Sequence, residues 1–388
     1  MRSTMRRGRG LRVAAVAVAA AFLLAACGDE EAVEEPATED TDAEEPDDAD
    51  ETEEVEEETE EEEAAGDDEL AEFYADETFT IVVGFSAGGG YDTYARTIAA
   101  HLGDHIPGNP NVIVENLTGA ASLVSANQLF TTLPSDGTVM GHFIGPLLLG
   151  QVLGNPAAQF EAREFNFVGA AVADTTTCVV RADAGVDNLE QLRDRDEPLV
   201  FGGVGTGSNT DDVPNTLIEF FDLNINLVTG YDGTADIRVA MEQGEVDAGC
   251  WAWESQRVIL AEELESGFLI PLAQAGTEPH PDNPDVPLFR DLAQDERDEQ
   301  IISAAIDSPA LFARPFAMHP DAPADRVAAI QRAFAATMED PAFLERAEDS
   351  NIAIDPISAE ELQSLVEALY DLPEDLAADL AEVFIPEQ

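Results

Sequence analysis

The chain has 388 residues, of which 81 are Asp or Glu and 18 are Arg, and its formal net charge at pH 7 is −63. It contains no lysine, which excludes a Walker-type phosphate loop, a Schiff-base enzyme and a protein kinase, because each of these needs one. The scarcity of basic residues also argues against a nucleic-acid partner, since phosphate binding needs a basic face. A surface this acidic would suit a high-salt exterior, where repulsion between carboxylates is screened.

The first 27 residues have the pattern of a secretion signal. A leader with five arginines precedes an apolar run over residues 13–26, which is too short to cross a bilayer as a helix. The run ends in Leu-Ala-Ala-Cys-Gly, which resembles the lipobox of bacterial lipoproteins, so we expect Cys27 to be lipidated. A plain signal peptide with a chance cysteine is the alternative. Lipidation would anchor the protein to the cell membrane, outside the cytoplasm.

Residues 28–77 are expected to form a disordered acidic tether. The part from 29 to 69 holds 26 Asp or Glu, no basic residue and almost no large apolar side chain. Such a segment cannot bury enough surface to offset its ordering entropy, and repulsion between its carboxylates extends it. The alternative to a role as a spacer between membrane and folded part is that this acidic segment binds cations.

Short apolar strands alternate with amphipathic helices from residue 79 onward, which is the pattern of βαβ winding. The alternation resumes after Phe165, and the apolar spacing after Ala324 is helical. Because the roughly 319 residues after the acidic run exceed a usual single core, we expect an α/β fold with two lobes. The expected strands are 79–83, 111–115, 139–143, 178–181, 198–201, 227–228 and 246–251, and the expected helices are 92–102, 121–131, 215–221, one beginning at 324, and 362–369.

Glycine-rich turns between strands and helices are candidate anion sites. The first is Gly88-Gly89-Gly90 in IVVGFSAGGGYDTYAR, where Asp92 can cap the next helix. FGGVGTGSNTDD at 201–212 and the turn at 231–234 also precede helices. Helix N-termini carry unpaired N–H groups and positive dipole ends, so three of them facing one cleft could hold an anion without Arg or Lys. Tight turns without a ligand are the alternative. Hydroxyl donors could come from Ser86, Thr206, Ser208, Tyr231 and Thr234.

Two cysteines remain after the one in the lipobox. Cys178 and Cys250 both lie in expected strands of the second half, and an exported protein can hold a disulfide. Two buried free thiols are an equally open alternative, because spacing in the sequence does not give connectivity in space.

Five motifs in order resemble those of the Bug-type extracytoplasmic solute receptors of tripartite tricarboxylate transporters. The resemblance covers nearly the whole chain from Phe79 to Val383. Each motif alone is weak, but their order is specific. The five stretches are VGFSAGGGYDTYAR, VENLTGA, LPSDGTVM, FGGVGTGS and GYDGTADIRVAMEQGEVDAG.

The resemblance implies a type II periplasmic-binding-protein-like fold, in which a small carboxylate is closed between two lobes and delivered to integral-membrane permease subunits. It implies a discontinuous first lobe, residues 78–173 plus 274–388, and a second lobe of residues 174–273, with the chain returning near 269–275. We expect a monomer without catalysis, cofactor or metal. With the glycine turns, the expected ligand-binding residues are Ser86, Gly88, Gly89, Gly90, Asp92, Gly119, Ala120, Thr206, Gly207, Ser208, Asn209, Tyr231, Gly233 and Thr234.

Some positions depart from the family pattern, and they bear on the ligand. The family usually has Pro at the position of Ala87, a small hydroxyl residue at Tyr91 and Ser at Gly203. It often has His at the position of Asp211 and Lys at that of Asp232. A dianion would meet repulsion if acidic side chains point into the cleft, so a monocarboxylate or an amphoteric compound stays open. For Tyr231 and Trp251, core packing and ligand contact are equally open. The acidic side chains in question belong to Asp92, Asp211, Asp212, Asp232 and Glu254.

Other functions have partial support in the sequence. Residues 84–88 fit the G-x-S-x-G elbow of a serine esterase with Ser86 as nucleophile, but the usual preceding strands are missing, and His142, His280 or His319 would have to serve as base. His101 and His105 lie four apart on a helix, without the glutamate of a metalloprotease. GGVGTG resembles a dinucleotide-binding turn, but it lies in the middle of the chain, where such a turn is not expected. A ligand sensor that signals to a membrane partner is a further alternative.

Overall fold

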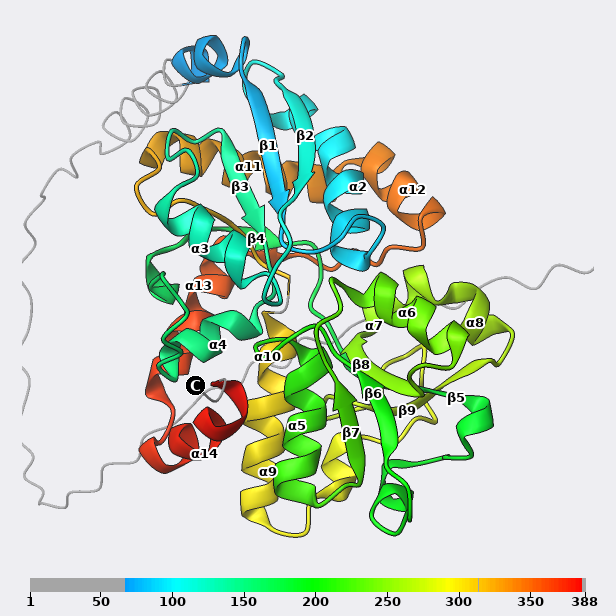
Figure 1. Cartoon of the computed structure of the whole chain (residues 1–388). Helices are drawn as coiled ribbons and strands as arrows, with labels where there is room; N and C mark the ends of the chain where they lie inside the picture. The colour runs from blue at the N-terminus through cyan, green and yellow to red at the C-terminus, as the bar shows by residue number, and fades with distance from the viewer. Residues whose placement is uncertain (1–66, 313, 386–388) are drawn as a thin grey trace, which may run out of the picture. The chain divides into compact units, whose positions relative to one another are not determined.

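The structure, a computed structural model, describes residues 67–312 and 314–385 (Figure 1). The expected signal peptide with Cys27, and residues 28–66 of the expected tether, lie outside the described residues. The end of that tether differs from the expectation, because residues 67–74 form a helix with Leu70 and Tyr74 buried. The Tyr74 hydroxyl donates a hydrogen bond to the Gly137 carbonyl oxygen at 2.9 Å. The folded part therefore begins no later than residue 67.

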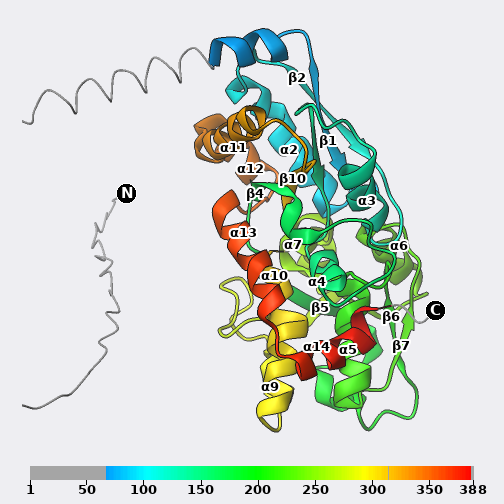
Figure 2. The same ribbon diagram turned by 90° about the vertical axis from the view of Figure 1, so that its left-hand side faces the viewer.

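The first sheet has six strands in the order β11 (Ile357–Ser358), β4 (Asn166–Ala170), β10 (Phe316–Met318), β3 (Val139–His142), β1 (Thr78–Val83) and β2 (Asn111–Asn116). β1 pairs in parallel with β2 and β3, whereas β10 runs antiparallel to both β3 and β4. Ile81, Val82 and Val83 of β1 are buried, as in a strand with helices on both faces of its sheet. In Figure 2 these strands lie between two groups of helices, α2 (Gly90–His105), α11 (Ala324–Glu339) and α12 (Pro341–Asp349) on one side and α3 (Leu123–Thr131) on the other.

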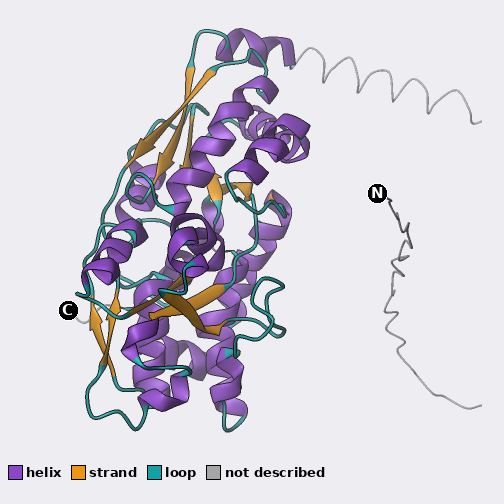
Figure 3. Ribbon diagram, turned by 90° about the vertical axis from the view of Figure 1, so that its right-hand side faces the viewer, coloured by secondary structure: helices purple, strands orange, loops and turns teal. Residues whose placement is uncertain are grey.

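The second sheet has five strands in the order β7 (Ile225–Val228), β6 (Leu199–Gly202), β8 (Ala248–Ala252), β5 (Thr176–Arg181) and β9 (Leu269–Gln274). β6 is parallel to β7 and β8, and β5 is antiparallel to β8 and β9. The two sheets are separate sets of strands in Figure 3, which confirms the expected α/β fold with two lobes. The helices that follow strands of this sheet are α5 (Asn209–Phe221), α6 (Thr234–Gln243), α7 (Trp253–Ile259) and α8 (Ala261–Glu265).

Two segments cross between the sheets, and the second comes later than expected. Residues 171–175 lead from β4 to β5, and residues 314 and 315 lead into β10 on the way back. The return was expected near 269–275, but that stretch is β9, which pairs with β5 of the second sheet. The chain then adds α9 (Glu296–Ile302), the π-helical turn Ser303–Asp307 and α10 (Ser308–Leu311), and the π-helical turn contacts α5.

The last helix also differs from the expectation that the C-terminal helices complete the first lobe. α13 (Ala359–Ala368) packs on β4, but α14 (Glu374–Phe384) contacts α5, α9 and α4 (Pro146–Val152) and so reaches the second lobe (Figure 2). The remaining short helices are the 3₁₀ turns Ala162–Glu164, Ala182–Ala184, Leu189–Leu192, Phe289–Leu292 and Leu369–Asp371.

Helix α5 begins six residues before the expected position of 215. Its N-cap residue is Ser208, and Pro214 lies inside the helix rather than before it. A proline in a helix removes one N–H donor, but Asp211 and Asp212 in the first turn accept hydrogen bonds from the preceding turn and fix the earlier start. Ser208 to Asp212 are consequently part of a helix N-terminus and not of a free loop.

Cys178 and Cys250 form a disulfide in the structure. They lie opposite each other on the antiparallel strands β5 and β8, and both are fully buried. The bond closes a loop with a sequence separation of 72 residues, which contains α5 and α6.

Among the described helices, none combines the length and apolar character that a membrane crossing requires.

Candidate ligand-binding cleft between the two lobes

One small cavity brings together turns from both sheets. Its volume is about 30 Å³, and its walls come from the turn after β1 with the start of α2, the turn before α5, the start of α6 and the end of β8. Half of the expected ligand-binding residues line it, namely Ser86, Gly89, Gly90, Ser208, Asn209, Gly233 and Thr234. The lining also contains Phe85, Tyr91, Ile144, Val204, Thr210, Trp251, Ala252 and Ser255, which the sequence did not single out as a set.

The other half of the expected set lies away from the cavity wall. Some of these residues shape the turns, since Gly88, Gly119 and Gly207 have positive φ values of 83°, 135° and 89°, which favour glycine. Ala120 also has a positive φ, 46°. The residues of the expected set that do not line the cavity are Gly88, Asp92, Gly119, Ala120, Thr206, Gly207 and Tyr231.

Three helix N-termini meet at this cavity, as the glycine turns suggested. The N-cap residues of α2, α5 and α6 are Gly89, Ser208 and Gly233, and all three line the cavity. The first N–H groups of a helix have no partner within the helix, and the dipole makes this end positive. Together they give the cavity a partial positive charge without a cationic side chain.

The chain's own carboxylates already occupy part of the glycine turns. The Gly88 N–H donates to Asp92 Oδ2 at 2.9 Å, and Arg96 Nε donates to the same oxygen at 2.9 Å. Burial alone would raise the pKa of Asp92, but the hydrogen bonds from Arg96, Gly88 and Asn116 outweigh it and hold that pKa below its usual range. The first turn therefore carries a paired, neutralised carboxylate.

In the second turn, the Gly205 N–H donates to Asp211 Oδ2 and the Gly207 N–H to Asp212 Oδ1, both at 2.9 Å. Burial raises the pKa of Asp211 and raises that of Asp212 further, because fewer hydrogen bonds offset burial at Asp212; the charge of Asp211 adds a smaller contribution there. Asp92, Asp211, Asp212 and Glu254, which could have pointed into the cleft, do not line it, and neither does Asp232.

Several glycines permit close approach between the lobes. A Cβ on Gly90 would lie 2.5 Å from Ser255 Cβ, and one on Gly207 would lie 2.8 Å from Leu147 Cδ2. Both distances are too short for real contacts, so α2 could not approach α7 this closely with alanine at position 90. Gly89, by contrast, has room, since its nearest neighbour would be Ser86 O at 3.5 Å. The glycines serve the contact between lobes as well as the cavity.

Two side-chain donors of the cavity wall have no hydrogen-bond partner among the described residues. They are Ser86 Oγ and Trp251 Nε1, and Trp251 is only 3 % exposed. A buried indole N–H normally has an acceptor, so these groups are the ones a ligand oxygen would satisfy.

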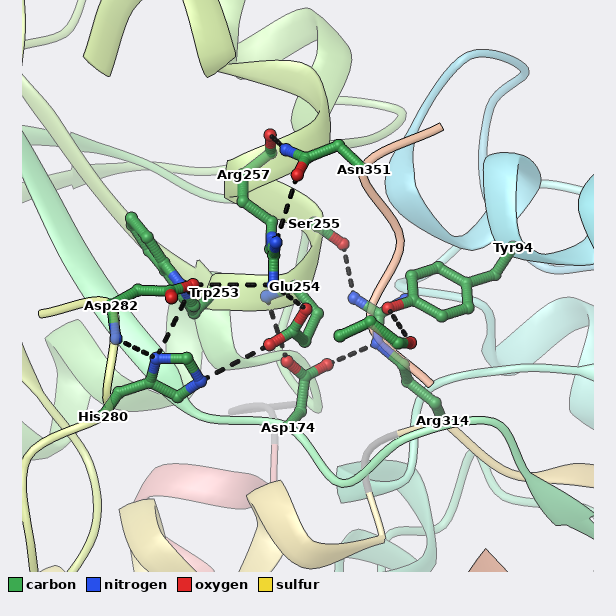
Figure 4. Close-up of polar contacts among 11 residues, drawn as sticks. Tyr94, Asp174, Trp253, Glu254, Ser255, Arg257, His280, Asp282, Arg314 and Asn351 are labelled. Carbon is green, nitrogen blue, oxygen red and sulfur yellow. Dashed lines mark hydrogen bonds and ion pairs between the residues drawn. The ribbon is translucent and has the colours of Figure 1, made fainter. Parts of the chain in front are cut away.

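A fully buried ion pair lies beside the cavity and joins the two crossing segments (Figure 4). Arg314 Nε donates to Asp174 Oδ2 at 2.5 Å, and Arg314 Nη2 donates to Ser255 Oγ at 2.6 Å. The guanidinium carbon lies 4.7 Å from the centre of the Tyr91 ring and 4.5 Å from that of Tyr94. Arg314 thus connects both crossing segments with α7 and α2, including two residues of the cavity wall, Ser255 and Tyr91.

Glu254 extends this network toward the opposite side (Figure 4). Its Oε1 lies 3.6 Å from His280 Nε2 and its Oε2 lies 3.6 Å from Arg257 Nη1. Arg257 Nη2 donates to Asn351 Oδ1 at 3.1 Å, which connects α7 to the segment after α12. Burial raises the pKa of Glu254 to about 7, and the charge of Asp174 contributes to this rise.

The raised pKa of Glu254 predicts a pH-dependent loss of stability. The pKa of Glu254 is near 4.5 in the unfolded chain and about 7 in the folded protein. Between these two pH values the carboxyl group is deprotonated in the unfolded chain but still protonated in the folded protein, so the free energy of unfolding falls as pH rises. Glu254→Gln should remove up to about 3 kcal/mol of this fall. Urea unfolding at pH 4.5 and pH 7.5 measures the difference. The exposed Glu262→Gln on α8 is the control, and equal profiles for the two variants would contradict the prediction.

The residues of the esterase alternative do not come together in the structure. Within the described residues Ser86 Oγ has no partner, while His142 Nδ1 lies 3.1 Å from Pro315 O. His280 Nδ1 accepts from the Asp282 N–H and His319 Nδ1 from the Asp321 N–H. The described part of the chain holds no group of three or more His, Cys, Asp or Glu that could hold a metal ion.

Comparisons with known proteins agree with this architecture. No family model matches the chain. A UPF0065 protein from the TAR-I ttuE-ttuC' intergenic region of Agrobacterium vitis is 25 % identical over 186 residues, which is 47 % of this chain and about half (53 %) of that relative.

Solved structures cover the folded part. The periplasmic binding protein BugD has a TM-score of 0.65 at 20 % identity, covering 80 % of this chain and 99 % of its own. MatC from Rhodopseudomonas palustris with bound malate has a TM-score of 0.62 at 20 % identity, covering 77 % and 98 %. An R. palustris protein with adipate has a TM-score of 0.64 at 19 % identity, covering 80 % and 98 %. The chain therefore has the fold of the Bug-type periplasmic binding proteins, which the order of its five motifs resembled.

Proposed function

We propose that the protein is an extracytoplasmic solute receptor that binds a small carboxylate metabolite between its lobes. The observation that carries the proposal is the meeting of three helix N-termini and two unpartnered donors, Ser86 Oγ and Trp251 Nε1, at one cavity between two sheets. Amides and dipole ends of this kind favour an anion. Malate and adipate in two proteins of the same fold support a carboxylate as the ligand.

Ligand entry requires the lobes to move. A cavity of about 30 Å³ is far smaller than a usual ligand pocket, so a metabolite fits only when the lobes stand further apart. The ligand bridges both lobes and gains contacts as they close, so it favours the closed form by its differential affinity. The crossing segments that contain Asp174 and Arg314 are the hinge in this proposal.

The receptor would deliver its ligand to a permease of the tripartite tricarboxylate type. In this proposal Cys27 carries the lipid anchor, the acidic run provides reach from the membrane, and the receptor acts as a monomer without catalysis. The resemblance of the five motifs and the fold of BugD support the transport role.

A thermal-shift screen against mono-, di- and tricarboxylates tests the binding proposal. An acid that binds only the folded state should raise the melting temperature, because at a concentration 100 times its Kd it adds about 2.7 kcal/mol. A panel without a single stabilising acid would contradict the proposal.

Closure is tested by Gly90→Ala, because a methyl group there meets Ser255 of the other lobe. We expect about tenfold weaker binding of the acid found in the screen, measured by calorimetry, as overpacking costs about 1–3 kcal/mol. Gly150→Ala in α4 is the matched control, since its Cβ would find no atom closer than 3.8 Å. Equal affinities of the two variants would count against closure at this contact.

A further inference from the structure

The turn of the second lobe has few main-chain donors left for a ligand. The Val204 N–H donates to Thr210 Oγ1 at 2.9 Å, and the Gly205 and Gly207 N–H groups donate to Asp211 and Asp212. The next N–H group, that of Ser208, is bonded to the Gly205 carbonyl oxygen at 3.2 Å. The internal carboxylates thus take the place that an external anion would occupy at this turn.

These two carboxylates differ from Asp92 in their charge environment. Asp211 and Asp212 are 2 % and 1 % exposed, and within the described residues neither forms an ion pair. Their partners are amides and hydroxyls, including Thr229 Oγ1 on Asp211. Asp92, in the first lobe, is paired with Arg96 at 2.9 Å. Burial raises the pKa of both, so they act on a ligand mainly by occupying the Gly205 and Gly207 amides rather than by their charge. The second lobe therefore offers a further anionic group neither a cation nor these amides.

The remaining wall of the cavity is apolar or neutral. None of the described residues that line it is Asp, Glu, Arg or His. Phe85, Ile144, Val204 and the ring of Trp251 supply apolar surface, and the Trp251 indole N–H is a buried donor without a partner. Such a wall fits an apolar ligand body that ends in a neutral oxygen rather than a second carboxylate.

We propose that the cleft selects a carboxylate with one negative charge and an apolar body, an inference that rests on the proposed function. The charged end lies at the start of α2 with Ser86 Oγ as donor, and the far end lies against Trp251, whose Nε1–H donates to a neutral oxygen. Asp211 and Asp212 act as specificity-determining residues that exclude a second anionic group from the second lobe.

The test compares two pairs of probes that differ by one charge at nearly equal shape, monomethyl adipate against adipate and monomethyl succinate against succinate. Calorimetry at pH 7.5 should show binding of the monoester that is tighter by about tenfold or more in at least one pair, because a second carboxylate would be buried at low dielectric without a cation or a free amide to pair with. Tighter or equal binding of the diacids would overturn the selectivity and leave the proposed function standing. Binding of none of the four would overturn the selectivity, whereas the proposed function is decided by the wider panel of acids in the thermal-shift screen.

Two variants assign the selectivity to residues. Asp212→Ala frees the Gly207 N–H for a ligand oxygen, so the diacid should gain about tenfold and the monoester should change little. Trp251→Phe keeps an aromatic side chain but removes the indole N–H, and it should weaken binding of the monoester about tenfold. Asp325→Asn, an exposed acid in the first turn of α11, is the matched control and should alter neither probe. An unchanged diacid-to-monoester ratio in Asp212→Ala, with a melting curve like that of the parent, would contradict the role of Asp212.

Discussion

Replacing Arg314 with methionine should lower the free energy of unfolding by about 3–5 kcal/mol, because the change leaves the Asp174 carboxylate buried without its partner. Both side chains are fully buried, and burial by itself raises the pKa of Asp174 even with the guanidinium in place. A buried charge without its partner destabilises the folded state by far more than the intact ion pair stabilises it. Arg314 also loses its contact with Ser255 Oγ.

Urea unfolding followed by circular dichroism measures this loss. Asp174→Asn combined with Arg314→Met should recover most of it, since the amide is neutral and its oxygen can still accept from the Glu254 N–H. Arg332→Met is the matched control, because Arg332 is 58 % exposed in its pair with Asp67 and such pairs contribute at most about 1 kcal/mol. If Arg314→Met cost no more than Arg332→Met, the buried pair would not hold the two crossing segments together.

The Arg314 network also suggests how the hinge and the cleft are connected. Ser255 and Tyr91 line the cavity, and both contact the guanidinium that joins the crossing segments. A ligand that shifts either wall residue acts directly on the group that ties the segments together. Arg257 and Asn351 form a second connection between the lobes, close to Glu254.

Local signals in the sequence predicted the strands and turns that build the cleft. β1 and α2 have regular patterns, and the glycine turns before α2 and α6 indicated where those helices begin, whereas α5 begins six residues before the expected position. All three helix starts line the same cavity. β10 has only three residues, too few for an alternating pattern, and its place between β3 and β4 depends on partners far along the chain. The expected return of the chain near 269–275 failed for the same reason, because β9 is indistinguishable by pattern from a strand of the first sheet.

The parts of the site that the sequence did not reveal depend on contacts over long separations. Asp174 and Arg314 are 140 residues apart, and neither has a motif around it that marks a buried pair. The glycine turns suggested amides free for an anion, whereas Asp92, Asp211 and Asp212 take several of them. An Asp four to six residues after a turn glycine could have indicated this. From the start of the helix its carboxylate can reach back and accept a hydrogen bond from the N–H group of that glycine.

The disulfide gives the second large expected effect. Replacing both Cys178 and Cys250 with alanine should lower the free energy of unfolding by about 4 kcal/mol, because the bond closes a loop of 72 residues and restricts the unfolded chain. Urea unfolding with and without reductant measures this, and reductant should destabilise the parent protein but not the double variant. Mass spectrometry of the unreduced protein should show the two cysteines joined, and two alkylatable thiols would contradict the prediction.

The position of this loop makes the disulfide relevant to binding as well as to stability. The loop between the two cysteines contains the N-termini of α5 and α6, and therefore Ser208, Asn209, Gly233 and Thr234 of the cavity wall. The wall residues of the first lobe, including Ser86 and Gly90, lie outside it. Reduction should consequently weaken ligand binding through the second lobe, with hydrogen exchange increasing in α5 and α6 before it increases in α2. Faster exchange in α2 first would show that the bond stabilises the lobes together rather than the half of the cleft that it encloses.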